Sequence, residues 1–256
     1  MVEIKHLYKS FEENSVLEDI NARFEKGKVN MIIGQSGSGK TVLLKCTVGL
    51  YAPTSGEVLY DGRNLLSMNK KEVKLLHREQ GMLFQGSALF DSMTVLENVL
   101  FPLTMFSLEK KKNQLTRAME CIERVNLKGS EKLYPDEISG GMQKRVAIAR
   151  AIALKPKYLF YDEPNSGLDP KTSLVIDELI QNITQEYGMT TIVNTHDMNS
   201  VMGIGDNIIF IHKGKKDWEG TKNGIFTSSD ENLNKFVFAS NLFKDVKDMH
   251  LNNLEG

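Results

Sequence analysis

The feature that most constrains the fold is a glycine-rich segment between an apolar run and a helical pattern. Residues 34–41 read Gly-Gln-Ser-Gly-Ser-Gly-Lys-Thr. Residues 29–33 before them are mostly apolar, and the apolar spacing of residues 41–48 after them is typical of a helix. A strand, a glycine loop and a helix in this order form a phosphate-binding unit, because the loop turns backbone N–H groups towards phosphate oxygens.

The loop predicts a site for ATP and Mg²⁺. Lys40 is placed to reach the β and γ phosphates, and the Thr41 hydroxyl is placed to hold Mg²⁺. The whole loop is therefore a candidate nucleotide site, formed by Gly34, Gln35, Ser36, Gly37, Ser38, Gly39, Lys40 and Thr41.

Two acidic residues follow another apolar run, residues 158–161. At the end of a buried strand, Asp162 can order Mg²⁺ and its water, while Glu163 can accept a proton from the water that attacks the γ-phosphate. Beside a glycine loop, this pair predicts hydrolysis of ATP rather than a strand that meets a solvated turn.

The remaining pattern indicates an α/β fold. The first residues alternate apolar and polar, which favours short antiparallel strands, and residues 93–127 read as amphipathic helix interrupted at Pro102. Strand patterns at 190–194 and 207–211 alternate with helical patterns at 142–154 and 171–187, which predicts a parallel sheet flanked by helices. The tail beyond Gly220 suits a helical extension, with its apolar residues at Leu233, Phe236, Val237, Leu242 and Phe243.

Composition excludes several kinds of partner. A formal net charge of -1 provides no field to gather nucleic acid, so none is expected. Cys46 and Cys121 lie far apart without metal-ligand spacing, which indicates reduced thiols in the cytoplasm. No apolar run is long enough to span a bilayer, so work at a membrane requires docking to another protein.

Residues 138–145 carry a specific resemblance. They read Ile-Ser-Gly-Gly-Met-Gln-Lys-Arg and precede the helix that leads to Asp162. The segment resembles the LSGGQ signature of ABC ATPases, from which it departs at Ile138 and Met142. Ser139 and the amides of Gly140 and Gly141 can bind a γ-phosphate at a helix N-terminus. The resemblance implies that this second anion site closes on ATP held by another copy of the chain, which makes a homodimer.

The resemblance also implies the domain organisation. It predicts a P-loop NTPase with a RecA-like parallel sheet flanked by helices, an antiparallel β edge and an inserted helical subdomain. A single ATPase domain would span residues 1–220, with its catalytic core at 1–88 and 146–220, its helical subdomain at about 89–145, and a C-terminal extension at 221–256.

Further residues match positions of the family one by one. Phe11 resembles the aromatic residue that stacks on adenine, with Tyr8 as the alternative. Gln85 resembles the glutamine that contacts Mg²⁺ or the attacking water. Asp169 ends a loop, residues 166–169, that resembles the one crossing the dimer interface, and His196 resembles the switch histidine at the γ-phosphate. The resemblance thus implies catalytic roles for Glu163, His196, Gln85 and Lys40, and metal ligands at Thr41, Gln85 and Asp162.

A narrower resemblance concerns the cargo. Residues 88–92 read Ala-Leu-Phe-Asp-Ser and residues 94–99 read Thr-Val-Leu-Glu-Asn-Val, which is similar to the ATPases of bacterial MCE-type lipid transporters, the MlaF group. That resemblance implies a permease dimer and an MCE-domain protein as partners, phospholipid as cargo, and a place on the cytoplasmic face of the inner membrane. Exposed apolar residues between Gln85 and Phe106 would form a groove for the permease.

Other interpretations remain within and outside this class. A polar amino-acid or methionine importer fits the same motifs, including residues 134–137, and lipoprotein release is a further variant. ABC ATPases of chromosomes or DNA repair would need long heptad repeats, which residues 42–137 do not show. A translation-associated ABC protein would carry two cassettes, and a regulator without hydrolysis would not need Glu163 and His196.

Overall fold

The structure, a computed structural model, describes residues 1–239 and divides the chain into two units. Unit 1 contains residues 1–67 and the described residues from 194 onward, and unit 2 contains residues 68–193. Within the described part, no helix is both long and apolar enough to cross a membrane.

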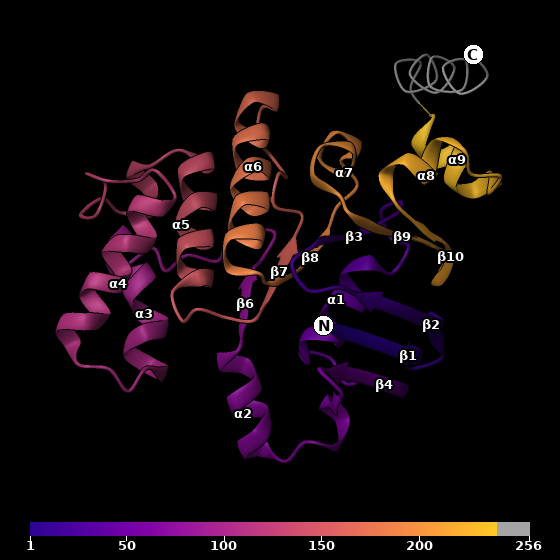
Figure 1. Ribbon diagram of the computed structural model, residues 1–256, viewed down its shortest axis with the longest axis horizontal. Coiled ribbons are helices and arrows are strands. Elements are labelled where there is room, and N and C mark those ends of the chain that lie inside the picture. The colour runs from indigo at the N-terminus through magenta and orange to yellow at the C-terminus, as the bar shows by residue number, and fades with distance from the viewer. Residues whose placement is uncertain (240–256) are drawn as a thin grey trace. The chain divides into compact units, whose positions relative to one another are not determined.

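An antiparallel sheet begins unit 1, as the alternating sequence predicted. Strand β1 (Val2–Phe11) lies between β2 (Asn14–Phe24) and β4 (Ser55–Tyr60), and the two-residue strand β5 (Arg63–Asn64) continues from β4 (Figure 1). The alternation places Val2, Ile4 and Leu7 in the core, because successive side chains of a strand point to opposite faces.

Unit 1 also contains the strand that precedes the glycine loop. Strand β3 (Val29–Ile33) is buried at every position and pairs in parallel with β9 (Asn207–His212), as predicted, while β10 (Lys215–Gly220) pairs antiparallel with β9. Strand β10 was not predicted, because its side chains are alternately exposed and half-buried and none of them is buried in the core. The helices of this unit are α1 (Lys40–Val48), α7 (Met198–Ile204), α8 (Lys222–Phe226) and α9 (Glu231–Val237), with a 3₁₀ turn at Leu65–Ser67.

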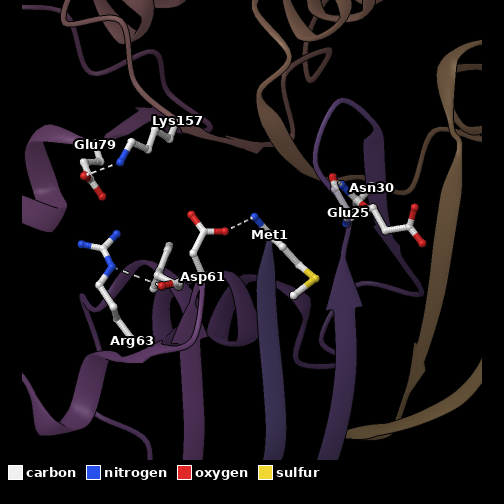
Figure 2. Close-up of polar contacts among 8 residues, drawn as sticks. Met1, Glu25, Asn30, Asp61, Arg63, Glu79 and Lys157 are labelled. Carbon is white, nitrogen blue, oxygen red and sulfur yellow. Dashed lines mark hydrogen bonds and ion pairs between the residues drawn. The ribbon is translucent and has the colours of Figure 1, made fainter.

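Hydrogen bonds and an ion pair join residues at the ends of these strands (Figure 2). The Met1 amino group donates to the Asp61 carboxylate at 2.7 Å, next to the turn between β4 and β5. The Asn30 side chain exchanges two hydrogen bonds with the Glu25 backbone, accepting from its N–H at 2.8 Å and donating to its carbonyl at 3.0 Å. Asn30 is fully buried, so these bonds replace the water that its amide loses on folding.

Unit 2 is built on parallel strands. Strand β7 (Tyr158–Asp162), buried throughout, pairs in parallel with β6 (Gln80–Leu83) on one side and neighbours β8 (Thr190–Asn194) on the other. The starts of β6 and β7 are joined by Lys157, whose ammonium donates to Glu79 at 2.8 Å and whose backbone N–H donates to the Glu79 carbonyl at 2.8 Å (Figure 2).

Helices α3, α4 and α5 of unit 2 contact one another (Figure 1). The helices of this unit are α2 (Lys70–Arg78), α3 (Val95–Phe106), α4 (Lys111–Arg124), α5 (Gly140–Ile152) and α6 (Pro170–Tyr187), with a 3₁₀ turn at Pro135–Glu137. Helices α5 and α6 confirm the predicted helical segments, whereas α2 was not predicted.

The prediction that Pro102 interrupts the helix was wrong, because Pro102 lies inside α3. A proline removes one helix hydrogen bond, which would otherwise join residue 102 to the carbonyl of Asn98. The buried Asn98 side chain compensates by fixing the start of the helix, since it donates to the carbonyls of Phe90, Met93 and Thr94 at 3.1, 3.0 and 3.1 Å. The helix instead ends at Phe106.

The predicted tail helix is present as far as the structure describes it. Leu233 and Val237 of α9 are buried, and the Phe236 ring lies 5.4 Å from that of Phe210 in β9, measured between centroids. Leu242 and Phe243 lie outside the described residues. Cys46 and Cys121 are both buried free thiols, and burial raises the pKa of each to about 11.

Gly81 fixes the distance between β6 and α5. A Cβ at this position would lie 2.3 Å from the Ala151 carbonyl oxygen of α5 and 2.8 Å from Leu159 Cδ2 of β7. We therefore expect Gly81→Ala to lower the free energy of unfolding by about 1–3 kcal/mol, because the backbone must move to relieve the overlap. Urea denaturation of the full chain measures this change.

Gly86 provides the matched control on the same segment. A Cβ there would meet no atom within 4 Å. Gly86→Ala should change the free energy of unfolding by no more than about 0.5 kcal/mol. Equal unfolding midpoints for the two variants would refute the packing role of Gly81.

Candidate functional site

The glycine loop of unit 1 joins β3 to α1 as predicted. Gly39, the residue before the helix, has φ 105°, which a residue with a side chain rarely adopts. No side chain caps the first turn of α1, so its backbone N–H groups are directed to whatever lies at the helix N-terminus. An anion is the favoured ligand there, because the helix dipole adds positive charge.

Lys40 brings a positive charge into the same loop. Its side chain is buried, and its ammonium donates to the carbonyls of Gly34 at 2.8 Å and Gln35 at 3.0 Å. The Ser38 hydroxyl is also buried and has no hydrogen-bond partner among the described residues. An ammonium, a hydroxyl and a set of backbone N–H groups form a donor set that fits a phosphate group.

Thr41, the predicted Mg²⁺ ligand, contacts a residue that the sequence analysis missed. The Asn194 side-chain amide, fully buried at the end of β8, donates to the Thr41 hydroxyl oxygen at 3.1 Å. His196 is exposed and follows two residues later. The Thr195 backbone N–H donates to the Ile32 carbonyl of β3 at 3.1 Å, which holds residues 194–196 beside the strand that leads into the glycine loop. Unit 1 thus brings Thr41 and the His196 segment together.

An aromatic corner surrounds the predicted adenine contact. Phe11 and Tyr8 are equally exposed, at 40% each, but only Phe11 packs against another aromatic ring. Its ring centroid lies 5.5 Å from that of Tyr51 in an edge contact, and the Lys9 ammonium lies 4.5 Å from the Phe11 centroid. An exposed ring held by its neighbours fits a base-stacking role. Tyr51 was missed, although it is the sole aromatic residue of the turn after α1.

The acidic pair lies in unit 2 at the end of β7. Asp162 and Glu163 are both buried, which is unusual for carboxylates and favours positively charged neighbours. Glu163 has φ 49°, a left-handed conformation that costs a non-glycine residue about 1–2 kcal/mol. Such strain is maintained only where the surrounding structure fixes the residue, and it often marks a functional position.

A buried cation, Lys144 of α5, faces this pair. Burial lowers the pKa of Lys144, whereas the charges of Asp162 and Glu163 oppose that shift. Its ammonium donates to the backbone carbonyl of Gln85 at 2.5 Å, so α5 connects the carboxylates with the Gln85 segment. Gln85 itself is exposed. Lys144 was not predicted to belong to the site, although a lysine on the apolar face of a predicted helix indicates a buried charge with a partner.

The signature segment and the loop before α6 lie together in unit 2. Ser139 caps α5 by accepting from the Met142 N–H at 3.3 Å, and a Cβ at Gly141 would lie 2.5 Å from Thr172 Cγ2. Asp169 caps α6 by accepting from the Thr172 N–H at 3.0 Å, and bonds to Thr172 hold the pKa of Asp169 below its usual value. Ser139, Gly140 and Asp169 are exposed, so both helix N-termini can receive an anion or a partner.

Candidate ligands for a metal ion that binds together with a nucleotide occur in each unit. In the part of the chain that the structure describes, no group of His, Cys, Asp and Glu side chains forms a metal site. Magnesium in nucleotide sites is held by few protein ligands together with phosphates and water. In unit 1 the Thr41 hydroxyl, which accepts from Asn194, is an oxygen ligand of that kind, and in unit 2 the side chains of Gln85 and Asp162 carry such oxygens.

Comparison with known proteins identifies relatives over most of the chain. The sequence profile of a family described as ABC transporter matches residues 17–166. The chain is 35% identical to the "Probable ribonucleotide transport ATP-binding protein mkl" of Mycobacterium leprae, over 92% of this chain and 68% of that protein. It is 37% identical to the L-cystine import ATP-binding protein TcyC of Bacillus subtilis, over 90% of this chain and 94% of that protein. It is 35% identical to the intermembrane phospholipid transport system ATP-binding protein MlaF of Haemophilus influenzae, over 93% and 90%.

Solved structures agree with the fold. Two dimeric structures of a bacterial ABC transporter cassette, 33% identical, superpose with TM-scores of 0.80 and 0.79 and cover 87% of this chain and 99% of theirs. One of them shows a post-hydrolysis state bound to ADP and phosphate. The predicted α/β architecture with an antiparallel β edge and added helices is thereby confirmed.

The Asn194 amide provides a test of whether Thr41 contributes to Mg²⁺-dependent binding of ATP. Asn194→Ala removes one neutral hydrogen bond to Thr41, worth about 1 kcal/mol, so ATP binding in the presence of Mg²⁺ should weaken roughly fivefold. Isothermal titration of the full chain with ATP measures this change. Binding in EDTA should stay the same, because the glycine loop is intact; an equal loss with and without metal would contradict the role of Asn194 in orienting Thr41.

Proposed function

The chain belongs to the ABC transporter family and is an ATPase that hydrolyses ATP to ADP and phosphate, and from this premise we propose that it drives phospholipid transport between the inner and outer membranes. In this proposal two copies of the chain act on a permease dimer that carries an MCE-domain protein. The ATPase lies on the cytoplasmic face of the inner membrane and binds no nucleic acid.

The observation that carries the proposed coupling is an apolar hollow of about 330 Å³ in unit 2. Its lining includes Phe84, Ala88, Phe90, Phe101, Pro102 and Phe106. The rings of Phe90 and Phe101 lie 4.7 Å apart between centroids, and Phe90 and Phe106 are about two-fifths exposed, at 40% and 38%. An exposed aromatic hollow of this kind fits an apolar helix end of a partner.

The hollow adjoins the segment that carries Gln85. Phe84 and Ala88 line it on either side of that residue, so a segment of the permease in the hollow would touch the same loop. The proposed helical subdomain at about 89–145 supplies Phe101 and Phe106. Occupancy of the hollow would thereby affect the position of Gln85.

Hydrolysis is assigned to residues of both units. Lys40 and the loop amides bind the phosphates in one copy, and Ser139 with Gly140 and Gly141 of the other copy closes on the γ-phosphate. Thr41, Asp162 and Gln85 would hold Mg²⁺, which would supply positive charge to the phosphates. Glu163 takes the proton of the attacking water, and His196 donates to the γ-phosphate. Phe11 holds the adenine ring, and Asp169 lies at the dimer interface.

The cargo rests on the likeness to the MlaF protein and on the segments at 88–92 and 94–99. A second candidate is import of a polar amino acid or methionine, which the likeness to TcyC favours to a similar degree. A permease sets the cargo, so the two candidates differ in the partner. Neither candidate function assigns a role to residues 221–256.

The partner decides between them. The tagged chain, purified from its native membrane in mild detergent, is analysed by mass spectrometry for proteins and lipids. Recovery of a permease with an MCE-domain protein and phospholipid supports lipid transport. A permease with an amino-acid-binding protein would replace that cargo with the importer alternative.

The role of Glu163 gives a direct prediction. Glu163→Gln keeps the shape of the side chain but removes the base, so ATP turnover should fall at least roughly 100-fold while ATP binding persists. The bound ATP should hold the dimer closed, which gel filtration with ATP and Mg²⁺ detects as a shift to twice the mass. Turnover at the wild-type rate would remove Glu163 from catalysis.

The hollow gives a separate prediction. Phe106→Glu places a charge at its exposed wall and should reduce recovery of the permease at least roughly tenfold, because the carboxylate must be desolvated on docking. ATP hydrolysis by the isolated chain should stay near its normal rate. Leu115→Glu on α4, which is 45% exposed and does not line this hollow, is the control and should leave recovery unchanged. Normal recovery with Phe106→Glu would exclude the hollow as the docking site.

A further inference from the structure

Two cations of α5 bind the segment that follows β6. Lys144 donates to the Gln85 carbonyl at 2.5 Å. One turn and a half further along the helix, the Arg150 guanidinium donates to the carbonyls of Ser87 at 2.8 Å and Ala88 at 2.7 Å. Three carbonyls within four residues are therefore held by a single helix.

The held segment has an unfavourable backbone conformation. Ser87 and Ala88 have φ 61° and 48°, so two successive non-glycine residues adopt the left-handed region. The turn itself supplies the bonds from the Ser87 N–H to the Phe84 carbonyl, 2.9 Å, and from the Ala88 N–H to the Gly86 carbonyl, 2.7 Å. A planar guanidinium binds both carbonyls with donors in a fixed geometry, and so restrains this conformation.

The C-terminal end of α5 packs closely against β6. Gly81 of β6 meets the Ala151 carbonyl so closely that a Cβ would lie 2.3 Å from it. Lys144 and Arg150 therefore belong to a helix that lies directly against the strand before Gln85. Lys144 also lies in the field of Asp162 and Glu163, and Arg150 lines the apolar hollow.

We propose that Lys144 and Arg150 are positioning residues for ATP hydrolysis, and that their bonds to residues 85, 87 and 88 set the place of the Gln85 side chain. The proposal rests on the function proposed above for Gln85. Lys144 binds the segment close to the carboxylates of Asp162 and Glu163, and Arg150 binds it beside the apolar hollow. Neither residue touches the reacting atoms; both act through the backbone of the segment that they hold.

Steady-state kinetics of the full chain separate positioning from binding. Lys144→Met keeps the length of the side chain but donates no hydrogen bond, so kcat should fall by about 10- to 100-fold, as expected for a misplaced catalytic group. The KM for ATP should stay within about twofold, because the nucleotide loop is untouched. Lys144→Gln restores an N–H donor without charge and should return kcat to within about threefold of the normal value.

Three kinetic outcomes would overturn the proposal. They are an unchanged kcat in Lys144→Met, a raised KM with unchanged kcat, and no recovery in Lys144→Gln. The variant Gln85→Ala separates this failure from that of the proposed function. If Gln85→Ala hydrolyses ATP normally, Gln85 has no catalytic role, and the positioning role of Lys144 and Arg150 falls with it, whereas the proposed lipid transport is not affected. If it is slow while Lys144→Met is normal, only the positioning role falls.

Amide hydrogen exchange tests Arg150 without reference to activity. Arg150→Met should raise exchange in a peptide covering residues 84–90 by at least about tenfold, because the left-handed turn loses its fixed carbonyls. Arg150→Lys, a milder change, should give an intermediate increase. The matched control is Arg117→Met on α4, since Arg117 also donates to two backbone carbonyls, those of Ile152 at 3.0 Å and Ala153 at 3.2 Å. Equal exchange of residues 84–90 in the Arg150 and Arg117 variants would overturn the role of Arg150.

Discussion

The arrangement of both units depends on burying an ammonium group among backbone carbonyls. Lys40 is 6% exposed and Lys144 is 5% exposed, and each donates to the backbone of a loop that carries candidate site residues. A buried cation is costly unless oxygen atoms replace its water. Each loop must therefore keep its carbonyls where the lysine reaches them, and that requirement fixes the loop. The lysine in turn gives the loop a positive charge, which suits phosphate in unit 1 and balances two carboxylates in unit 2.

Both loops contain residues in the left-handed conformation, but they differ in the residue types that adopt it. The loop of unit 1 uses glycines, so its left-handed residues such as Gly39 add little strain. The segment after β6 uses Ser87 and Ala88 instead, and there the left-handed conformation is held by a guanidinium from α5. A glycine-rich loop can adjust its backbone N–H groups to a ligand. A segment held by Arg150 keeps one conformation until its hydrogen bonds to Arg150 are broken. A segment held in this way is suited to change conformation when a partner binds beside it.

Sequence patterns predicted the elements that are set by local rules. The strand, loop and helix at β3 and α1 and the strand that ends at Asp162 were predicted because neighbouring residues determine each of them. The prediction of a break at Pro102 was wrong, and the hydrogen bonds by which the buried Asn98 side chain holds the start of α3 could not be seen in the sequence. Asn194 and Lys144 were missed because their contacts join residues 153 and 59 positions apart. The roles assigned to Glu163 and His196 stay predictions, since they depend on a bound nucleotide.

Helix α5 explains how a contact in the hollow can reach the signature segment. Its 13 residues span about 20 Å at 1.5 Å per residue, with Ser139 before its first turn and Arg150 in its last. Val146, Ala147 and Ala149 on the packed side of this helix are fully buried, and close-packed side chains of this kind resist movement. A push on the segment that Arg150 holds must therefore move either that segment or the whole helix. In the first case the Gln85 backbone shifts, and in the second case the N-terminus at Ser139 shifts. Both candidate parts of the ATP site in unit 2 thus lie beside the helix that also lines the hollow.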